Sequence, residues 1–240
     1  MMAIVSNTVS YLDGEVLLEA FVAFDDSFSS RRPAVLINHA WGGRDDFVAG
    51  KAKKIAESGY IGFALDMYGK GVSGSGPEQN AKLMQPFMAD RSMLQKRIKA
   101  AFDAVKLMPW VDDTKIAAIG FCFGGLCVLD LARTGADLKG AVSFHGLLDA
   151  PNNIKDTAIK AKILVLHGHD DPLAPHEQVT AFAEEMTRAG ADWQLHLYGN
   201  TQHAFTNPAA NDPDFGTVYQ PTADRRSWIA MENFLTEIFA

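Results

Sequence analysis

A single cysteine at the centre of a glycine-rich segment carries the clearest chemical signal in the sequence. Residues 120–125 read Gly-Phe-Cys-Phe-Gly-Gly, with Cys122 as the reactive side chain. The spacing G-x-nucleophile-x-G is typical of a nucleophile elbow, a sharp turn from a strand into a helix. Side chains at Gly120 or Gly124 would collide with that strand and helix. A thiol at a helix N-terminus also meets the positive end of the helix dipole, which favours the thiolate. The sequence therefore predicts that Cys122 is a pre-activated nucleophile.

Two structural alternatives accompany this interpretation. Free cysteines are often buried, and glycine-rich turns between a strand and a helix also bind phosphate. The second cysteine, Cys127, lies beside Leu126 and Val128 within the predicted helix and is expected to be a packed core thiol. The two cysteines form neither a disulfide framework nor a CxxC pair, so they suit a reducing compartment.

Two further reactive side chains follow predicted strands later in the chain. A thiol nucleophile needs a base, and the base needs an orienting partner. Apolar residues 163–167 lead into a polar turn with Asp170 and Asp171, and His203 follows the apolar residues 194–198. The resulting order of nucleophile, acid and histidine differs from that of the chymotrypsin and subtilisin triads. We therefore expect these residues to form a catalytic triad.

Alternating strands and helices must position these residues. Apolar runs of strand length occupy residues 16–24, 34–39, 60–66, 116–121, 140–145, 163–167 and 194–198. Helical spacing appears at 49–57, 93–106, 123–132, 178–189 and 222–239, with Asp45, Asp46 and Thr222 as candidate caps. This alternation predicts one α/β domain over residues 1–240, with a mostly parallel sheet and helices on both faces. The glycine-rich segment 70–77 is expected to be a surface loop beside the ligand site.

The composition excludes several classes of function. The chain has 240 residues, of which 48% are hydrophobic and 21% charged, so it can bury a substantial core. Its net charge of −7 and scattered basic residues argue against binding to nucleic acid or an anionic membrane. No apolar stretch approaches the ~20 residues of a membrane span, and residues 1–11 lack a secretory pattern. A cytoplasmic location is the expectation.

Four segments together resemble the dienelactone hydrolases, α/β-hydrolases that use a Cys-His-Asp triad. They are residues 66–69 (Asp-Met-Tyr-Gly), 120–125, 167–172 (His-Gly-His-Asp-Asp-Pro) and 203–205 (His-Ala-Phe). The resemblance implies the α/β-hydrolase fold and a reaction without metal or organic cofactor. It also implies small-molecule ester or lactone substrates.

The resemblance implies a role for each matching residue. Cys122 would be the nucleophile, His203 the general base and then acid, and Asp171 the residue that orients His203. Asp171 is preferred over Asp170 because the family's acid directly precedes the proline-containing turn. The oxyanion hole would consist of the backbone N–H groups of Phe123 and Ala40.

The sequence departs from the family prototype at two positions that concern the substrate. The prototype has a glutamate where this chain has His39, and an arginine for the substrate carboxylate where this chain has Asn207. Arg91 or Lys82 could supply a replacement cation. Because a buried carboxylate without a charge partner is costly, we expect neutral esters to be turned over at least as well as anionic lactones.

Three side chains near the predicted site have both a structural and a functional interpretation. His39 either fills and hydrogen-bonds the pocket wall or contacts the substrate or the nucleophile. Trp41 is expected to line the pocket, and His145 to pack near the same edge of the sheet.

Three alternative functions remain open. A Cys122 thiolate could attack a neutral phosphate triester, since the phosphoryl thioester has a better leaving group than a phosphoryl serine. A zinc-dependent hydrolase is conceivable because His167, His169, Asp170 and Asp171 lie close in sequence to one another, with His203 as a further ligand. A hydrolase-like scaffold that only binds a ligand is the third alternative.

Overall fold

The strands and helices were located in a computed structural model, which describes residues 3–154 and 157–240. Residues 1–2 lie outside the described residues. They belong to the segment 1–11, for which the sequence analysis predicted no secretory pattern. The chain divides into two compact units, residues 1–119 and 120–240. The expected single domain over residues 1–240 stays a prediction.

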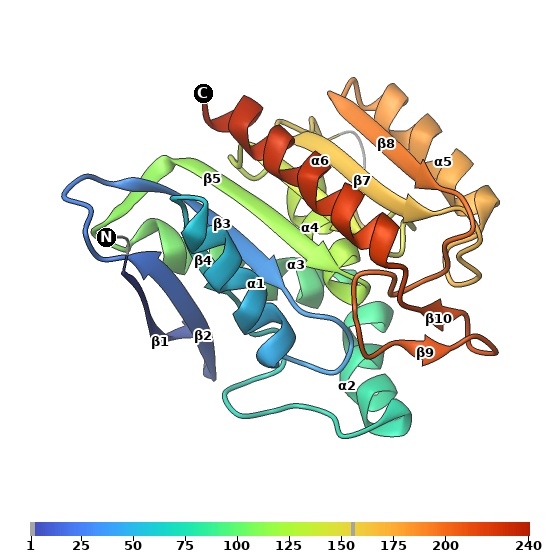
Figure 1. The fold of residues 1–240 in the computed structure, drawn as a ribbon, viewed down its shortest axis with the longest axis horizontal. Coiled ribbons are helices and arrows are strands. Elements are labelled where there is room, and N and C mark those ends of the chain that lie inside the picture. Colours follow the sequence, from blue (N-terminus) through green and yellow to red (C-terminus); the bar gives the residue numbers. More distant parts are fainter. Residues whose placement is uncertain (1–2, 155–156) are drawn as a thin grey trace. The chain divides into compact units, whose positions relative to one another are not determined.

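Strands and helices alternate along most of the first unit, which begins with a pair of strands. Its elements are β1 (Ile4–Asp13), β2 (Val16–Asp25), β3 (Arg32–Asn38), α1 (Asp46–Glu57), β4 (Ile61–Ala64), α2 (Pro77–Ala89) and α3 (Arg91–Lys106). β2 pairs antiparallel with both β1 and β4, whereas β4 pairs parallel with β3. Figure 1 shows α1 in front of these strands and α3 behind them. The strand β5 (Val111–Phe121) then leads into the second unit.

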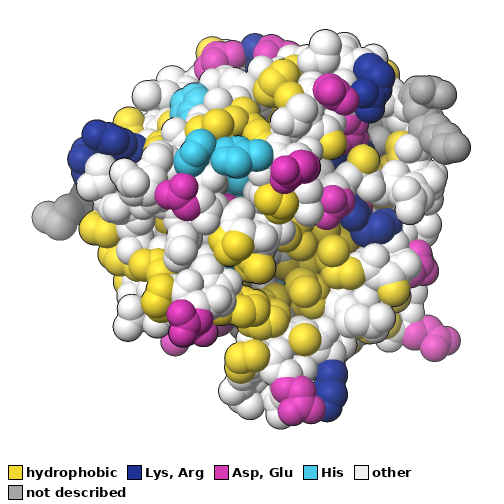
Figure 2. Space-filling model, turned by 90° about the vertical axis from the view of Figure 1, so that its right-hand side faces the viewer, with side chains coloured by type: hydrophobic (Ala, Val, Ile, Leu, Met, Phe, Trp, Pro, Cys, Tyr) yellow, Lys and Arg dark blue, Asp and Glu magenta, His cyan; other side chains and the backbone are white. Residues whose placement is uncertain are grey.

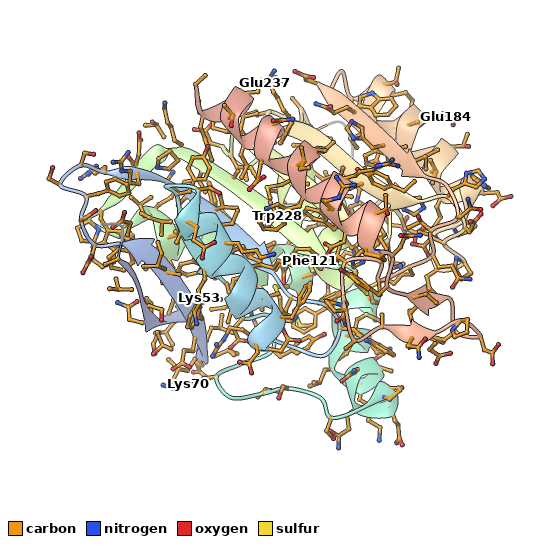
Figure 3. All side chains as sticks on the ribbon, viewed as in Figure 1. Lys53, Lys70, Phe121, Glu184, Trp228 and Glu237 are labelled. Carbon is orange, nitrogen blue, oxygen red and sulfur yellow. The ribbon has the colours of Figure 1, made fainter. Side chains whose placement is uncertain are left out.

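The second unit continues the alternation of strand and helix. Its elements are α4 (Phe123–Arg133), β6 (Gly140–Phe144), β7 (Lys162–Gly168), α5 (His176–Arg188), β8 (Trp193–Tyr198), β9 (Asn211–Asp212), β10 (Thr217–Val218) and α6 (Pro221–Phe239). β7 pairs parallel with β6 and β8, while β9 and β10 form a small separate hairpin. β6 is buried throughout and β7 is buried at six of its seven positions, which fits strands covered on both faces. Aromatic rings extend this core from Phe121 to Phe144 and on to Trp228 of α6 (Figure 3).

Side-chain caps mark the start of three of the helices among the described residues, α1, α3 and α6. Asp45 accepts a hydrogen bond from the backbone N–H of Val48 and so caps α1, as predicted. The predicted cap Thr222 is wrong, because Pro221 already occupies the first turn of α6 and Gln220 provides the capping oxygen. Residues 70–76 are irregular as expected, but the helix α2 that follows them was not predicted. Among the described residues, no helix combines the length and apolar character needed to cross a membrane.

Candidate active site

Cys122 occupies the turn between β5 and α4. Its backbone adopts φ 54° and ψ −118°, a strained conformation for a residue with a side chain. A Cβ atom at Gly120 would overlap the backbone carbonyl of Gly124, so the turn requires glycine there. Cys122 is partly exposed, whereas Cys127 is buried inside α4 as expected. The local structure thus has the form of a nucleophile elbow.

The strained elbow is held by hydrogen bonds from the end of β6. The backbone N–H of Cys122 donates to the Phe144 carbonyl at 3.1 Å and to Nδ1 of His145 at 3.2 Å. Phe123 and Gly124 are the first two residues of α4, so their backbone N–H groups lie at the positive end of the helix dipole. These groups are suited to receive a developing negative charge.

Asp171 and His203 form a buried pair. Nδ1 of His203 donates to Oδ2 of Asp171 at 2.8 Å, and both side chains are almost completely shielded from solvent. The other carboxylate oxygen accepts the backbone N–H groups of Leu173 and Ala174 at 2.9 and 3.2 Å. The neighbouring Asp170 is exposed. The structure therefore brings Asp171, and not Asp170, together with His203.

A short hairpin holds the backbone of His203 on both sides. Its N–H donates to the Gly216 carbonyl at 2.9 Å, and its carbonyl accepts the N–H of Val218 at 3.0 Å. Gly216 has φ +80°, and a Cβ atom there would overlap the ring of Pro172, the residue after Asp171. The β9–β10 hairpin thus connects the histidine loop to the aspartate loop. The sequence analysis missed this element, although the dipeptide Phe215-Gly216 follows an aspartate-rich turn signal.

The electrostatics of His203 indicate an ion pair with the nucleophile. Burial by itself lowers the pKa of His203, but the charge of Cys122 and the hydrogen bond with Asp171 outweigh it and raise the pKa to about 10. The raised pKa favours a protonated imidazole beside Cys122.

The remaining predicted site residues belong to the first unit. His39 is fully buried, with Nδ1–H donating to the Ala40 carbonyl at 2.6 Å and Nε2 accepting the N–H of Met67 at 3.1 Å. Burial lowers the pKa of His39, which agrees with a neutral ring. The Tyr68 hydroxyl donates to the Trp41 carbonyl at 2.9 Å. His39 therefore ties the segment of Ala40 and Trp41 to the 66–69 turn, and the roles of Ala40 and Trp41 toward the substrate stay predictions.

The side chains considered above as partners for a substrate carboxylate have contacts or places of their own in the first and second units. The Asn207 side chain accepts the N–H of Ala209 at 3.0 Å. Lys82 forms an exposed ion pair with Glu78 of α2 at 2.7 Å, and Arg91 is the first residue of α3. Position 207 thus carries a neutral side chain that stabilises its own loop, and the expected lack of a charge partner there stays a prediction.

The side chains considered as zinc ligands point to different partners. Nε2 of the buried His167 donates to the Ala174 carbonyl at 2.9 Å, and burial lowers its pKa. Histidine side chains gather on the surface shown in Figure 2, and the rings of the exposed His169 and His176 lie 4.5 Å apart. Within residues 3–154 and 157–240, no three His, Cys, Asp or Glu side chains converge to hold a metal ion.

Comparison with known proteins identifies the relatives of this chain. A sequence profile described as the dienelactone hydrolase family matches residues 18–239. The chain belongs to the dienelactone hydrolase family. A solved structure of a dienelactone hydrolase-like promiscuous phosphotriesterase from metagenomic libraries superimposes with a TM-score of 0.93 at 37% identity, covering 99% of this chain and 100% of the other.

Two curated relatives of this dienelactone hydrolase family member have named activities. A putative carboxymethylenebutenolidase of Aquifex aeolicus is 28% identical, and the match covers 84% of this chain and 87% of the relative. A probable 2-oxo-3-(5-oxofuran-2-ylidene)propanoate lactonase of Bradyrhizobium is 26% identical, with 83% and 82% coverage. The predicted α/β-hydrolase fold, with a mostly parallel sheet and flanking helices, is confirmed, and the chain is a dienelactone hydrolase-like hydrolase.

Proposed function

We propose that this chain hydrolyses small esters or lactones through a Cys122 thiolate and a covalent acyl-enzyme, without a metal ion. The observation that carries the proposal is the buried contact of Nδ1 of His203 with Oδ2 of Asp171 at 2.8 Å, together with the strained elbow that presents Cys122. In this proposal Cys122 is deprotonated before substrate binds, since its negative charge is one of the interactions that raise the pKa of His203. Membership in a family whose relatives include lactonases agrees with this reaction class.

In the acylation half of the reaction, the Cys122 sulfur attacks the carbonyl carbon of the substrate and the C=O electron pair moves onto oxygen. The backbone N–H groups of Phe123 and Ala40 are proposed to receive this oxyanion. As the C=O bond re-forms, the C–O bond to the leaving alkoxide breaks, and that alkoxide takes a proton from Nε2 of His203. The product is a thioester on Cys122 and a neutral His203.

In the deacylation half, neutral His203 takes a proton from water while the water oxygen attacks the thioester carbonyl. The C–S bond then breaks and returns the electron pair to the Cys122 sulfur. Asp171 keeps Nδ1 of His203 protonated in both halves, so that Nε2 is the atom that exchanges protons. The thiolate and imidazolium pair is thereby restored for the next turnover.

The proposed function is tested by hydrolysis of aryl acetates and of neutral and anionic lactones in the presence of a chelator. We expect turnover of the neutral substrates, with Cys122→Ala and His203→Ala each lowering kcat/KM by several orders of magnitude. Because Asn207 stands in place of an arginine, the anionic lactone should be no better a substrate than the neutral one. Near-wild-type rates in a folded Cys122→Ala variant would refute the proposal.

A second candidate activity is hydrolysis of neutral phosphate triesters with the same groups. Support comes from the similarity to a promiscuous phosphotriesterase at 37% identity over nearly the whole chain. Attack of the thiolate on phosphorus would expel an aryloxide and leave a phosphoryl thioester, which water can hydrolyse because thiolate is a good leaving group. Sustained release of aryl alcohol under excess triester and chelator is expected. A single stoichiometric burst followed by permanent inactivation would contradict this activity.

A further inference from the structure

His145 lies beside the proposed triad without a role in the chemistry described above. It directly follows β6, is 2% exposed, and has a backbone φ of 39°, which is uncommon for a residue with a side chain. Its backbone N–H donates to the Leu166 carbonyl of β7 at 2.9 Å. The ring is therefore placed by the sheet and by a strained backbone, as is usual at functional positions.

Both nitrogens of the His145 ring have defined partners. Nδ1 lies 3.2 Å from the backbone nitrogen of Cys122, and Nε2 lies 2.8 Å from Oγ1 of Thr206. The Cys122 backbone N–H can only donate, so Nδ1 must carry a lone pair, and the ring proton then sits on Nε2 and points to Thr206. The two hydrogen bonds together select the neutral ring in one tautomer.

The same ring connects the nucleophile to the loop of the general base. Thr206 follows His203 by three residues. The His145 ring also meets the His203 ring edge-on, with centroids 5.1 Å apart and an interplanar angle of 67°, and it meets Phe205 similarly at 5.1 Å. One side chain thus contacts the backbone of Cys122, the ring of His203 and the segment that carries His203.

We propose that His145 is a positioning residue that sets the geometry of the Cys122–His203 pair. This inference rests on the proposed function. Removing Nδ1 leaves the Cys122 N–H with its second acceptor, the Phe144 carbonyl at 3.1 Å, so the elbow keeps one of its two hydrogen bonds. What is lost is the connection between the elbow and the histidine loop. The effect should therefore fall on the orientation of the ion pair more than on the existence of the turn.

A matched set of variants tests the proposal. His145→Leu removes both hydrogen bonds, whereas His145→Asn keeps an oxygen at the position of Nδ1, tolerates a positive φ and loses only the bond to Thr206. Thr206→Val removes only the hydroxyl, and Thr206→Ser retains it. His196→Leu removes an exposed histidine of β8 and serves as the control. Each protein is assayed for kcat and KM with an aryl acetate, and for the pH dependence of alkylation at Cys122, quantified on its peptide by mass spectrometry.

We expect His145→Leu and Thr206→Val to lower kcat about tenfold or more with KM within about twofold of wild type. Their alkylation profiles should lose reactivity at neutral pH, because the thiolate is less well paired with the imidazolium. Thr206→Ser should recover most of both properties. His145→Asn keeps only the acceptor toward Cys122, so it should be impaired to a similar degree as Thr206→Val, and the control should match wild type. Recovery by Thr206→Ser separates positioning from simple packing.

The proposal is overturned if folded His145→Leu keeps the wild-type kcat and alkylation profile, or if Thr206→Ser is as impaired as Thr206→Val. Should His145→Leu fail to fold, the comparison of Thr206→Val with Thr206→Ser decides the question by itself. The alkylation measurement needs no turnover. Absence of ester hydrolysis by the wild type would therefore refute the proposed function while the role of His145 is still decided.

Discussion

Replacing Asp171 by asparagine should impair both the charge and the tautomer of His203. The wild-type carboxylate accepts from Nδ1 of His203 at 2.8 Å and from the backbone N–H groups of Leu173 and Ala174. The asparagine oxygen can keep the two backbone bonds, which places its NH₂ group against the Nδ1–H of His203. Two donors then face each other in a site where both side chains are almost completely buried.

The size of the effect follows from the tautomer. In the serine protease triad, an asparagine in place of the orienting aspartate holds the histidine in the wrong tautomer and lowers kcat by about 10⁴. We therefore expect kcat/KM of Asp171→Asn to fall by about 10²–10⁴, and each factor of ten corresponds to about 1.4 kcal/mol of transition-state stabilisation. The pKa of His203 should also fall below its wild-type value of about 10, because Asp171 is one of the groups that raise it.

The pH dependence provides the sharper test. Wild-type kcat/KM should decline only as the pH rises through about 10, where the imidazolium is lost, and this limb should move to lower pH in Asp171→Asn. The pKa of His203 is about 10 in the folded chain and about 6.5 in the unfolded chain. The interactions of protonated His203 therefore stabilise the fold fully below about pH 6.5, and this contribution is lost as the pH rises toward 10. Profiles of kcat/KM and of urea unfolding from pH 6 to 10.5 measure both effects. Asp170→Asn is the control, and an unchanged alkaline limb with nearly full activity in Asp171→Asn would refute the reasoning.

Three further predictions concern the hairpin, the first unit and metal independence. Gly216→Ala should lower both stability and activity because its Cβ atom would overlap Pro172, whereas Gly190→Ala, with a similar φ of +63° but open space around it, should show only the smaller backbone cost in urea unfolding. Arg97→Met should destabilise the fold by about 3 kcal/mol by leaving Asp13 buried without its 2.8 Å partner. Burial by itself raises the pKa of Asp13, but Arg97 outweighs burial and lowers that pKa. The difference in unfolding free energy between wild type and Arg97→Met should therefore be largest near neutral pH and shrink as the pH falls below about 4. Prolonged dialysis against a chelator should leave ester hydrolysis unchanged, and loss of activity restored by added zinc would contradict the proposed mechanism.

The predicted elements that matched the structure are those with a strong local pattern. Residues 140–145 and 163–167 are short, mostly apolar runs, and both coincide with buried parallel strands. The strand β1 was missed because half of its residues are exposed and only two are buried, although the Asp13-Gly14 turn that joins it to β2 is a recognisable hairpin signal. The helix α2 was missed because it contains Pro86 inside it and buries Phe87 alone among its residues, so it lacks a continuous apolar face. Tertiary contacts, not local propensity, decide such segments.

The proposed site shows the same division. Cys122, Asp171 and His203 could be chosen from motifs and their order, because each follows a recognisable strand. The hairpin behind His203 consists of two strands of two residues each, which is too short for any periodicity to appear. The contacts of His145 join residues 23 and 61 positions away, and no local pattern predicts them. Sequence spacing therefore indicates the reacting groups, while the residues that orient them require the folded structure.

The central claim is that Cys122 carries the acyl group during turnover. The most direct test mixes the wild-type chain with an excess of an aryl acetate, quenches in acid within milliseconds, and locates the acetyl group by peptide mass spectrometry. The account predicts one acetyl group on the peptide that contains Cys122, appearing with the burst of aryl alcohol and absent from Cys122→Ala. Turnover that continues in Cys122→Ala, or an acetyl group on any other residue, would contradict it.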